Sequence, residues 1–351
     1  MTMNENARGL FSRGASSTLK RRVMLMYVPL IAANIGVWIW AFAAFHDHPV
    51  LLGTCALAYV LGLRHAVDPD HIAAIDNVTR KLMQEGREPI SVGLWFALGH
   101  SALICIAVCA IALTATSLSD ERFESWREIG GVVSTICSAL FLFTIAVFNM
   151  IVLVNVWKTY RALQRTGHYA EDQLEEMLKG RGFLARVMQP LFALISKGWH
   201  MLPLGFLFGL GFDTATEISL FSIAATESAR GFSLASIMIF PLLFTAGMAL
   251  IDTTDGVLML GAYRWAYVQP RRKLIYNLAI TTLSVVVALF IGLLETLALF
   301  GAKLELSDGF WKAVAALNAY YGDLGFVIVA LFAAVWLGAW LVYRSKRVAL
   351  P

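Results

Sequence analysis

The sequence RHAVDPDHIAAIDN, from Arg64 to Asn77, places a dense run of charged and histidine side chains inside an otherwise apolar part of the chain. Of the 351 residues, 58% are hydrophobic and only 15% are charged. Soluble domains are about 45–50% apolar and about 25% charged. Because a soluble fold of this length cannot bury so much apolar surface, the composition predicts a polytopic membrane protein and excludes a water-soluble enzyme.

Eight segments are long and apolar enough to cross a bilayer as helices, which takes about 20 residues each. They are residues 23–45, 50–75, 90–115, 129–156, 201–225, 232–258, 274–300 and 324–343. The predicted fold class is therefore all-α, with one integral-membrane domain over residues 1–351. The connections are short except for the polar segment 157–199, whose moderately apolar end, 183–195, is expected to lie on the membrane surface.

Lysine and arginine are unevenly distributed between the two sets of connections. The basic tail 1–22, the connections 76–89, 157–199 and 259–273, and the C-terminal tail hold 22 of the 28 basic residues, whereas the opposite connections hold five. Cytoplasmic loops carry the excess of basic residues in membrane proteins. The bias predicts that both termini are cytoplasmic, which requires an even number of spans. It also accounts for the net charge of +4 without a nucleic-acid partner.

The charged run in the second span cannot face lipid. One ionisable group deep in a bilayer costs about 2.5–3.5 kcal/mol on insertion scales, so the five groups in this run would cost on the order of ten. On a regular helix, His65, Asp68 and His71 fall within one arc, whereas Asp70 points away. Pro69 removes a backbone donor, so we expect the second helix to be broken here. An opened turn would let Asp70 join the other side chains.

Three further predicted spans carry polar groups at membrane depth. The third span holds Gly99-His100-Ser101, the fifth holds Asp213-Thr214-Ala215-Thr216-Glu217, and the sixth holds Asp252 and Asp255. The two carboxylates of each acidic pair lie three or four residues apart and share one helix face. Such groups form either structural polar seams or a path for a cation. We expect the path to be lined or supported by Arg64, Ser101, Asp213, Thr214, Glu217, Asp252 and Asp255.

Histidine together with carboxylate is the ligand set of borderline divalent transition metals. Imidazole suits nickel, cobalt, copper, zinc and iron(II), whereas carboxylates alone suit magnesium or calcium. The alternative is that these residues are buried, mutually paired and purely structural. Two His and two Asp within seven residues favour a metal site. The position of His100 along the third span places it at a depth similar to that of His65, so it is a further candidate ligand.

Short motifs recur between the two halves of the chain. Phe96-Ala97-Leu98-Gly99 in the third span is similar to Phe244-Thr245-Ala246-Gly247 in the sixth, and Leu61-Gly62-Leu63 is similar to Phe208-Gly209-Leu210. The offset of three spans is odd, so the two halves would have opposite orientations in the membrane. Inverted repeats with a binding site at their interface are typical of alternating-access carriers.

At four places the sequence resembles the nickel/cobalt transporter family. The stretch from Arg64 to Asn77 is similar to the family signature H-A-x-D-A-D-H of the second span, with Pro69 where the family usually has Ala. Three further stretches resemble its other signature segments in the same order, namely FALGHS (96–101), LGFDTATE (210–217) and GMALIDTTDG (247–256). The resemblance covers essentially the whole chain. The length of the chain and the sequences of its motifs are most similar to those of the high-affinity nickel permeases of hydrogen-oxidising bacteria.

The resemblance implies a secondary transporter, not an enzyme, that imports Ni²⁺ across the bacterial inner membrane, with Co²⁺ as a second substrate. The metal would supply enzymes such as hydrogenase or urease. Metal binding is assigned by motif match to His65, Asp68, Asp70, His71 and His100. The metal ion is cargo, so no resident cofactor is implied. The expected partners are the metal ion and the lipid bilayer, and no GxxxxGK[ST] motif indicates an ATPase.

Three other functions are compatible with the same ligand chemistry. The first is an efflux carrier, because topology does not fix the direction of transport. The second is a metal-gated channel or sensor. The third is an intramembrane metalloenzyme, which the sequence disfavours because it has no HExxH motif. A desaturase-like di-iron enzyme would also need many clustered histidines, and only three of the seven lie within predicted spans.

Overall fold

The computed structural model describes residues 5–114, 121–166, 195–211, 215–267 and 270–348. Within these ranges the chain is helical and contains no strand, so the predicted all-α class is confirmed. Six helices are long and apolar enough to span a membrane, or seven if one bent pair counts as a span. The predicted count of eight is therefore not confirmed. The apolar stretch expected on the membrane surface lies almost entirely outside the described residues.

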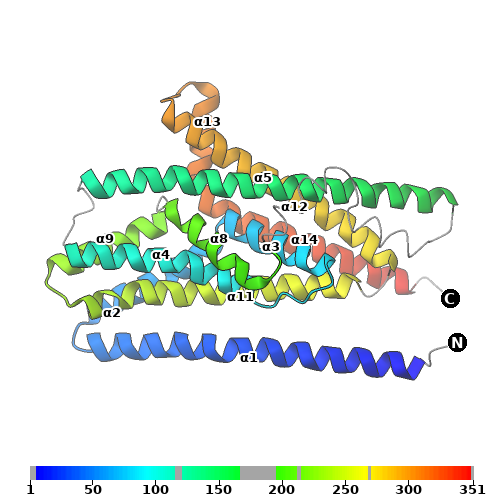
Figure 1. Cartoon of the computed structure of the whole chain (residues 1–351), viewed down its shortest axis with the longest axis horizontal. Coiled ribbons are helices and arrows are strands. Elements are labelled where there is room, and N and C mark those ends of the chain that lie inside the picture. Colours follow the sequence, from blue (N-terminus) through cyan, green and yellow to red (C-terminus); the bar gives the residue numbers. More distant parts are fainter. Residues whose placement is uncertain (1–4, 115–120, 167–194, 212–214, 268–269, 349–351) are drawn as a thin grey trace.

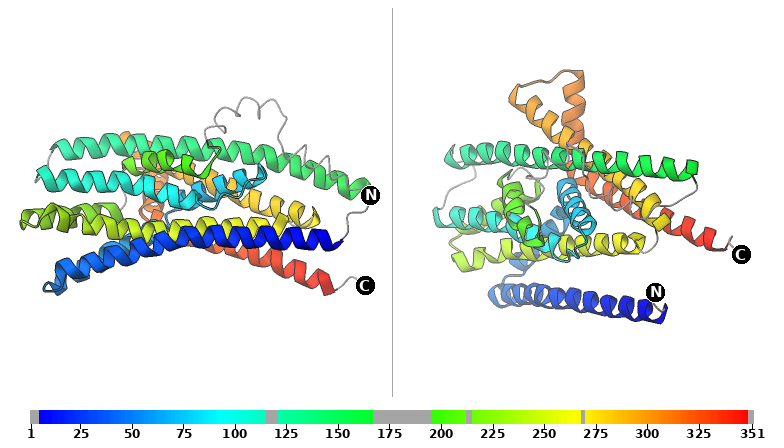
Figure 2. Two further views of the ribbon diagram at one scale, coloured as in Figure 1. Left: turned by 60° about the horizontal axis from the view of Figure 1, so that its bottom comes forward. Right: turned by 45° about the vertical axis from the view of Figure 1, so that its right-hand side comes forward.

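Four long helices run alongside one another as the main bundle (Figure 1). They are α1 (Glu5–Phe45), α4 (Val92–Thr114), α5 (Glu121–Thr166) and α11 (Ile239–Tyr267), the last preceded by the single turn of α10 (Leu234–Ile237). Two further helices, α12 (Pro270–Lys303) and α14 (Tyr321–Val348), cross this bundle at an angle and are joined by α13 (Gly309–Ala319), which projects from it (Figures 1 and 2). The start of α1 and the end of α14 lie at the same end of the molecule.

The second predicted span is broken at the charged run. It consists of α2 (Pro49–His65) and α3 (Pro69–Gln84), which are bent by 52° relative to each other. Pro69 is the first residue of α3, where its fixed φ suits a helix start and its missing N–H removes no hydrogen bond. Asp68 before it is extended, with φ −64° and ψ 143°, as a residue preceding proline prefers. The predicted break at Pro69 is confirmed.

The connection predicted over residues 76–89 is wrong in its first part. Helix α3 continues to Gln84 and packs against α4, α5, α11, α12 and α14. Arg80 is 0% exposed and Lys81 is 6% exposed. Lys81 Nζ donates to the carbonyl oxygen of Ile195 at 2.6 Å. These charges read as a solvated loop in the sequence, whereas in the fold they belong to a helix enclosed by its neighbours.

The fifth predicted span, residues 201–225, is also interrupted. Helix α8 (Met201–Phe208) follows a short 3₁₀ turn, η1 (Gly198–His200), and ends in a second one, η2 (Gly209–Gly211). Helix α9 (Ala215–Ala229) begins after three residues that lie outside the described ranges. The sequence predicted a break only in the second span, so this second interruption is a correction to the predicted fold.

Glycines allow the helices around both breaks to approach closely. A methyl group at Gly62 of α2 would lie 2.1 Å from the carbonyl oxygen of Phe244 on α11. A methyl group at Gly99 of α4 would lie 1.9 Å from the carbonyl oxygen of Leu202 on α8. Small residues commonly permit such backbone contact between membrane helices. Helix α2 is thereby packed closely against α11, and α8 against α4.

Candidate metal centre

Three histidines meet at the break in the second span. His65 is the last residue of α2, His71 lies in the first turn of α3, and His100 lies within α4. Their ring centroids are 4.8 Å apart in each of the three pairs. One potential ligand atom from each histidine lies within 4.8 Å of the other two. All three residues are at most 3% exposed. The structure therefore joins His100 to the run in the second span.

The Nδ1 atoms of two of these histidines, His65 and His71, are oriented by carboxylates. His65 Nδ1 lies 2.9 Å from Asp68 Oδ2 and 3.1 Å from Thr216 Oγ1. His71 Nδ1 lies 3.3 Å from Asp252 Oδ2. An imidazole that donates its Nδ1–H to a carboxylate keeps the Nε2 lone pair for a metal, an arrangement common among metal-ligating histidines. The hydrogen-bond pattern thus fits two imidazoles that offer Nε2 to a cation.

The third histidine shares its contacts with a carboxylate from the second half of the chain. His100 Nε2 lies 2.8 Å from His65 Nε2 and 3.1 Å from Glu217 Oε1. The same oxygen lies 3.9 Å from His65 Nε2. Two nitrogens that face each other can share one proton or bind a common cation. Glu217, on the first turn of α9, therefore lies beside the Nε2 atoms of both His65 and His100.

Several buried polar atoms at the centre lack partners. Among the described residues, His71 Nε2, His100 Nδ1 and Asp68 Oδ1 have no hydrogen-bond partner. Most buried polar atoms in native proteins are paired, so such atoms need an explanation. Phe96 lies beside His71 with ring centroids 4.8 Å apart, and Phe244 lies 5.4 Å from His65. In these apolar surroundings electrostatic attraction is stronger than in water, so a cation would complete the set.

The remaining predicted site residues occupy different positions. Asp70 Oδ1 accepts the backbone N–H of His71 at 3.0 Å, a contact within the first turn of α3. Arg64 Nη2 forms an ion pair with Asp323 Oδ1 of α14 at 3.2 Å. In the part of the chain that the structure describes, neither Asp70 nor Arg64 forms a hydrogen bond or ion pair with the three imidazoles.

Of the other residues predicted to line or support the path, some contact the histidines and others only lie near them. Ser101 is 1% exposed and follows His100 on α4, and Asp252 reaches His71 directly. Asp255 lies one turn further along α11 and is partly exposed. Asp213 and Thr214 lie outside the described residues. The structure thus brings Glu217 and Asp252 to the histidines, whereas Ser101 and Asp255 lie beside them along the same helices.

A second buried polar cluster was missed by the sequence reasoning. Asp76 is 0% exposed and accepts hydrogen bonds from the hydroxyls of Tyr263 and Ser284. Next to it, Asn77 Oδ1 accepts from Arg80 Nη2 at 2.8 Å and from an amide of α5. The sequence did contain a signal for this cluster. The signature stretch continues to Asn77, and Asp76 and Arg80 are four residues apart, which places them on one face if the helix continues. Treating this part as a loop concealed it.

The set of donors suits a borderline divalent metal. Three imidazoles and adjacent carboxylates provide nitrogen and oxygen ligands, as Ni²⁺, Co²⁺ and Zn²⁺ prefer. Within the described residues this is the one group of three or more His, Cys, Asp or Glu side chains that could hold a metal ion. The centre lies at the meeting point of α2, α3, α4, α9 and α11, between interrupted helices.

Comparison with known proteins gives a consistent result. The NicO family, described as "High-affinity nickel-transport protein", matches residues 51–342. The chain is 54% identical to the "High-affinity nickel transport protein" of Cupriavidus necator, over 93% of each chain. It is 52% identical to the "Hydrogenase nickel incorporation protein HupN" of Bradyrhizobium diazoefficiens, over 91% of this chain and 84% of that one. It is also 36% identical to the "Cobalt transport protein NhlF" of Rhodococcus rhodochrous, over 95% of this chain and 96% of that one.

No solved structure matches the chain, so the comparisons identify a family without supplying a template for the site. The family match spans both interrupted helices and all three histidines, and the relatives align over nearly their full length. Together with the apolar spanning helices, these matches place the protein among multi-pass membrane transporters. The chain belongs to the NicO family of high-affinity nickel-transport proteins.

Proposed function

We propose that this protein is a secondary transporter that imports Ni²⁺ with high affinity, with Co²⁺ as a second substrate. The observation that carries the proposal is the convergence of three buried imidazoles at the break of a membrane helix. Broken helices at membrane depth are typical of transporter binding sites, because their freed backbone groups are buried in protein or line a cavity. The names of relatives from Cupriavidus necator and Rhodococcus rhodochrous support nickel and cobalt as cargo.

In this proposal the metal binds at His65, Asp68, Asp70, His71 and His100. His65 and His71 offer nitrogen ligands while Asp68 and Asp252 accept their Nδ1–H groups. The translocation path is lined or supported by Arg64, Ser101, Asp213, Thr214, Glu217, Asp252 and Asp255. The family names support transport without catalysis, and the protein would act with the bilayer and the ion alone, without an ATPase subunit.

The topology that we propose has eight crossings, with α8 and α9 together forming one interrupted span. In support of an inverted repeat, both interrupted helices bring a carboxylate to a histidine, Asp68 from the first half and Glu217 from the second. The excess of basic residues favours cytoplasmic termini in the bacterial inner membrane. Nickel delivered inside would supply enzymes such as hydrogenase, in keeping with the name of the Bradyrhizobium relative.

The test is accumulation of ⁶³Ni²⁺ by cells that express the chain, with Co²⁺, Zn²⁺ and Mn²⁺ as competitors. Wild-type cells should accumulate nickel, and His65→Ala or Asp68→Asn should abolish accumulation while the protein remains in the membrane. Neither replacement adds a charge to hydrocarbon, so the fold should tolerate both. His46→Ala is the matched control, because His46 is an exposed histidine whose ring contacts Asp47 and the carbonyl oxygen of Ala43 instead of the metal centre.

The outcome also separates import from its rivals. Cells that lose preloaded ⁶³Ni²⁺ faster when they express the chain would indicate an efflux carrier. Flux that does not saturate at low metal concentration would indicate a channel. Normal uptake by both His65→Ala and Asp68→Asn would show that the metal does not bind at the break in the second span.

A further inference from the structure

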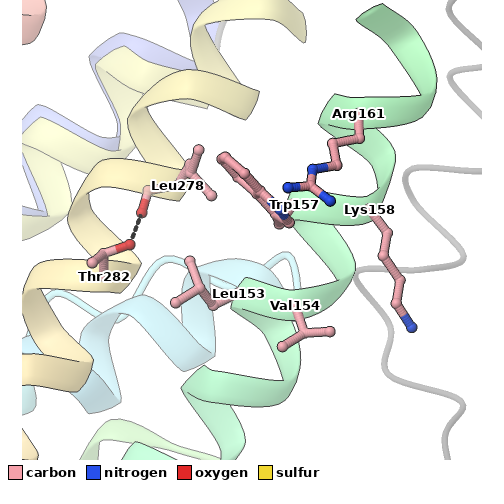
Figure 3. Close-up of a pocket in the computed structure, with 7 residues that line it drawn as sticks. All are labelled: Leu153, Val154, Trp157, Lys158, Arg161, Leu278 and Thr282. Carbon is pink, nitrogen blue, oxygen red and sulfur yellow. Dashed lines mark hydrogen bonds between the residues drawn. The ribbon is translucent and has the colours of Figure 1, made fainter. Parts of the chain in front are cut away.

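A groove lies between α5 and α12 at one boundary of the membrane-spanning region, away from the histidines. Its volume is about 520 Å³, which is in the range of sites that hold one small molecule. On α5, Lys158 is the first charged residue after Glu128, and on α12 the uncharged stretch begins at Leu274, directly after Lys273. The groove, here called the α5–α12 groove, is lined by Leu153, Val154, Trp157, Lys158, Arg161, Leu278 and Thr282 (Figure 3). It therefore straddles the point at which both helices leave the apolar region.

The floor of the groove is apolar. Leu153, Val154 and Leu278 contribute aliphatic side chains, and Val154 is 44% exposed. The hydroxyl of Thr282 donates to the carbonyl oxygen of Leu278 at 2.8 Å, as the dashed line in Figure 3 shows. Because this hydroxyl is already satisfied within α12, Thr282 adds no demand for a polar ligand. The floor is thus suited to a hydrocarbon chain.

The rim of the groove is aromatic and basic. Trp157 is 42% exposed, and the guanidinium carbon of Arg161 lies 5.1 Å from the centre of its ring (Figure 3). This cation–π contact holds the guanidinium beside the groove. Lys158 also lines the groove from the same turn of α5, although its side chain extends away from α12 (Figure 3). Within the described residues, neither Lys158 nor Arg161 is paired with a carboxylate, so two positive charges are left for an anion.

We propose that the α5–α12 groove binds one anionic phospholipid, with an acyl chain on the apolar floor and the phosphate beside Arg161, where the positive charge of Lys158 on the same turn of α5 adds to the attraction. Tryptophan prefers the headgroup level of a bilayer, and basic pockets between membrane helices bind anionic headgroups. Charge complementarity distinguishes this occupant from a zwitterionic lipid. The end of α5 lies at the same end of the molecule as the start of α1 and the end of α14, so the lipid belongs to the leaflet on that side (Figure 1).

The test uses the full-length protein purified in a neutral detergent, with native mass spectrometry to count and titrate bound phosphatidylglycerol. The wild-type protein should retain one phosphatidylglycerol in preference to phosphatidylcholine. A basic residue near an anionic lipid surface contributes about fivefold in affinity, so Lys158→Gln with Arg161→Gln should raise the Kd of that lipid about 25-fold. Both side chains are exposed, so the double variant should fold.

A matched control removes the same charges elsewhere at the same boundary. Lys20→Gln with Arg21→Gln also neutralises one exposed lysine and one exposed arginine, near the start of the α1 span. We expect it to keep the bound lipid. A third variant, Val154→Trp, fills the floor without changing the charge and should also exclude the lipid. Equal weakening by both double variants, equal binding of phosphatidylcholine, or retention of the lipid by Val154→Trp would each overturn the proposal.

Discussion

Replacing Glu217 with Gln should weaken nickel uptake without unfolding the protein. Glu217 Oε1 lies 3.1 Å from His100 Nε2 and 3.9 Å from His65 Nε2, and the residue is 2% exposed. Glutamine keeps the shape and one acceptor oxygen but removes the negative charge. Whether Glu217 binds the metal or only orients the imidazoles, its charge stabilises a cation at this point more strongly than an amide would.

The size of the effect follows from these contacts. A hydrogen bond to a charged group contributes about 1.5–3 kcal/mol, compared with about 1 kcal/mol for a neutral pair. The substitution should therefore cost about 0.5–2 kcal/mol of metal binding, which corresponds to an increase of about 2- to 30-fold in the apparent KM. Losses of about 10- to 100-fold are common when a partner of a metal-ligating histidine is removed.

The assay is the concentration dependence of ⁶³Ni²⁺ uptake, with the amount of membrane protein measured in parallel. Because KM equals Kd only when dissociation is fast relative to translocation, Ni²⁺ binding to the purified protein should be titrated as well. Glu227→Gln is the matched control, since Glu227 is a buried glutamate on the same helix, 5% exposed, that pairs with Arg230 instead. An unchanged KM and an unchanged affinity in Glu217→Gln, as in the control, would refute the assignment.

Three further predictions concern the break, the ligands and the packing around them. Pro69→Ala should shift the apparent KM by several-fold with little change in protein level, because alanine also fits a helix start; a large loss of protein in the membrane would show that the proline serves folding. Uptake should fall between about pH 7 and pH 5, because a free imidazole titrates near pH 6.5 and protons then compete with the metal; strong acid stimulation of initial rates would contradict this and indicate proton-coupled import. Gly62→Ala should lower the free energy of unfolding by about 1–3 kcal/mol, since the added methyl would lie 2.1 Å from a carbonyl oxygen. Gly53→Ala on the same helix is the control, because its methyl would meet nothing within 4 Å, and equal melting temperatures of the two variants would refute this packing.

The first half of the site could be predicted from the sequence because its residues are local. His65, Asp68 and His71 lie within seven residues, so their proximity holds for a helix, a kink or an open turn. The cost of charge in lipid then requires that they face protein. Pro69 supplied the position of the break, since proline has a fixed backbone preference. His100 was placed by counting the rise along two spans, which requires only that both helices be regular up to that point.

The fate of Arg80 shows where reasoning from charge fails. A sequence read by hydropathy ends a span at the first cluster of basic residues, so the connection was predicted to start at residue 76. The structure instead buries Arg80 completely and pairs its Nη2 with Asn77 Oδ1. Hydropathy reports the cost of contact with lipid, whereas a helix surrounded by five others meets other side chains instead. The residues of α5, α11 and α12 that form hydrogen bonds with Asp76 and Asn77 in this polar layer are far away in sequence and could not be foreseen.

The directions of the side chains that α9 contributes to the site could not be predicted from the sequence, for a related reason. Placing Glu217 from the sequence assumed one regular helix over residues 201–225, in which the phase counted along the helix fixes the direction of each side chain. Helical phase carries information only while the helix is continuous, and a 3₁₀ turn interrupts this one at Gly209–Gly211. Beyond the interruption the direction of each side chain depends on how α9 packs against α4 and α2. Thr216 and Glu217 reach the histidines because the first turn of α9 meets the break at the end of α2, a contact that local spacing does not encode.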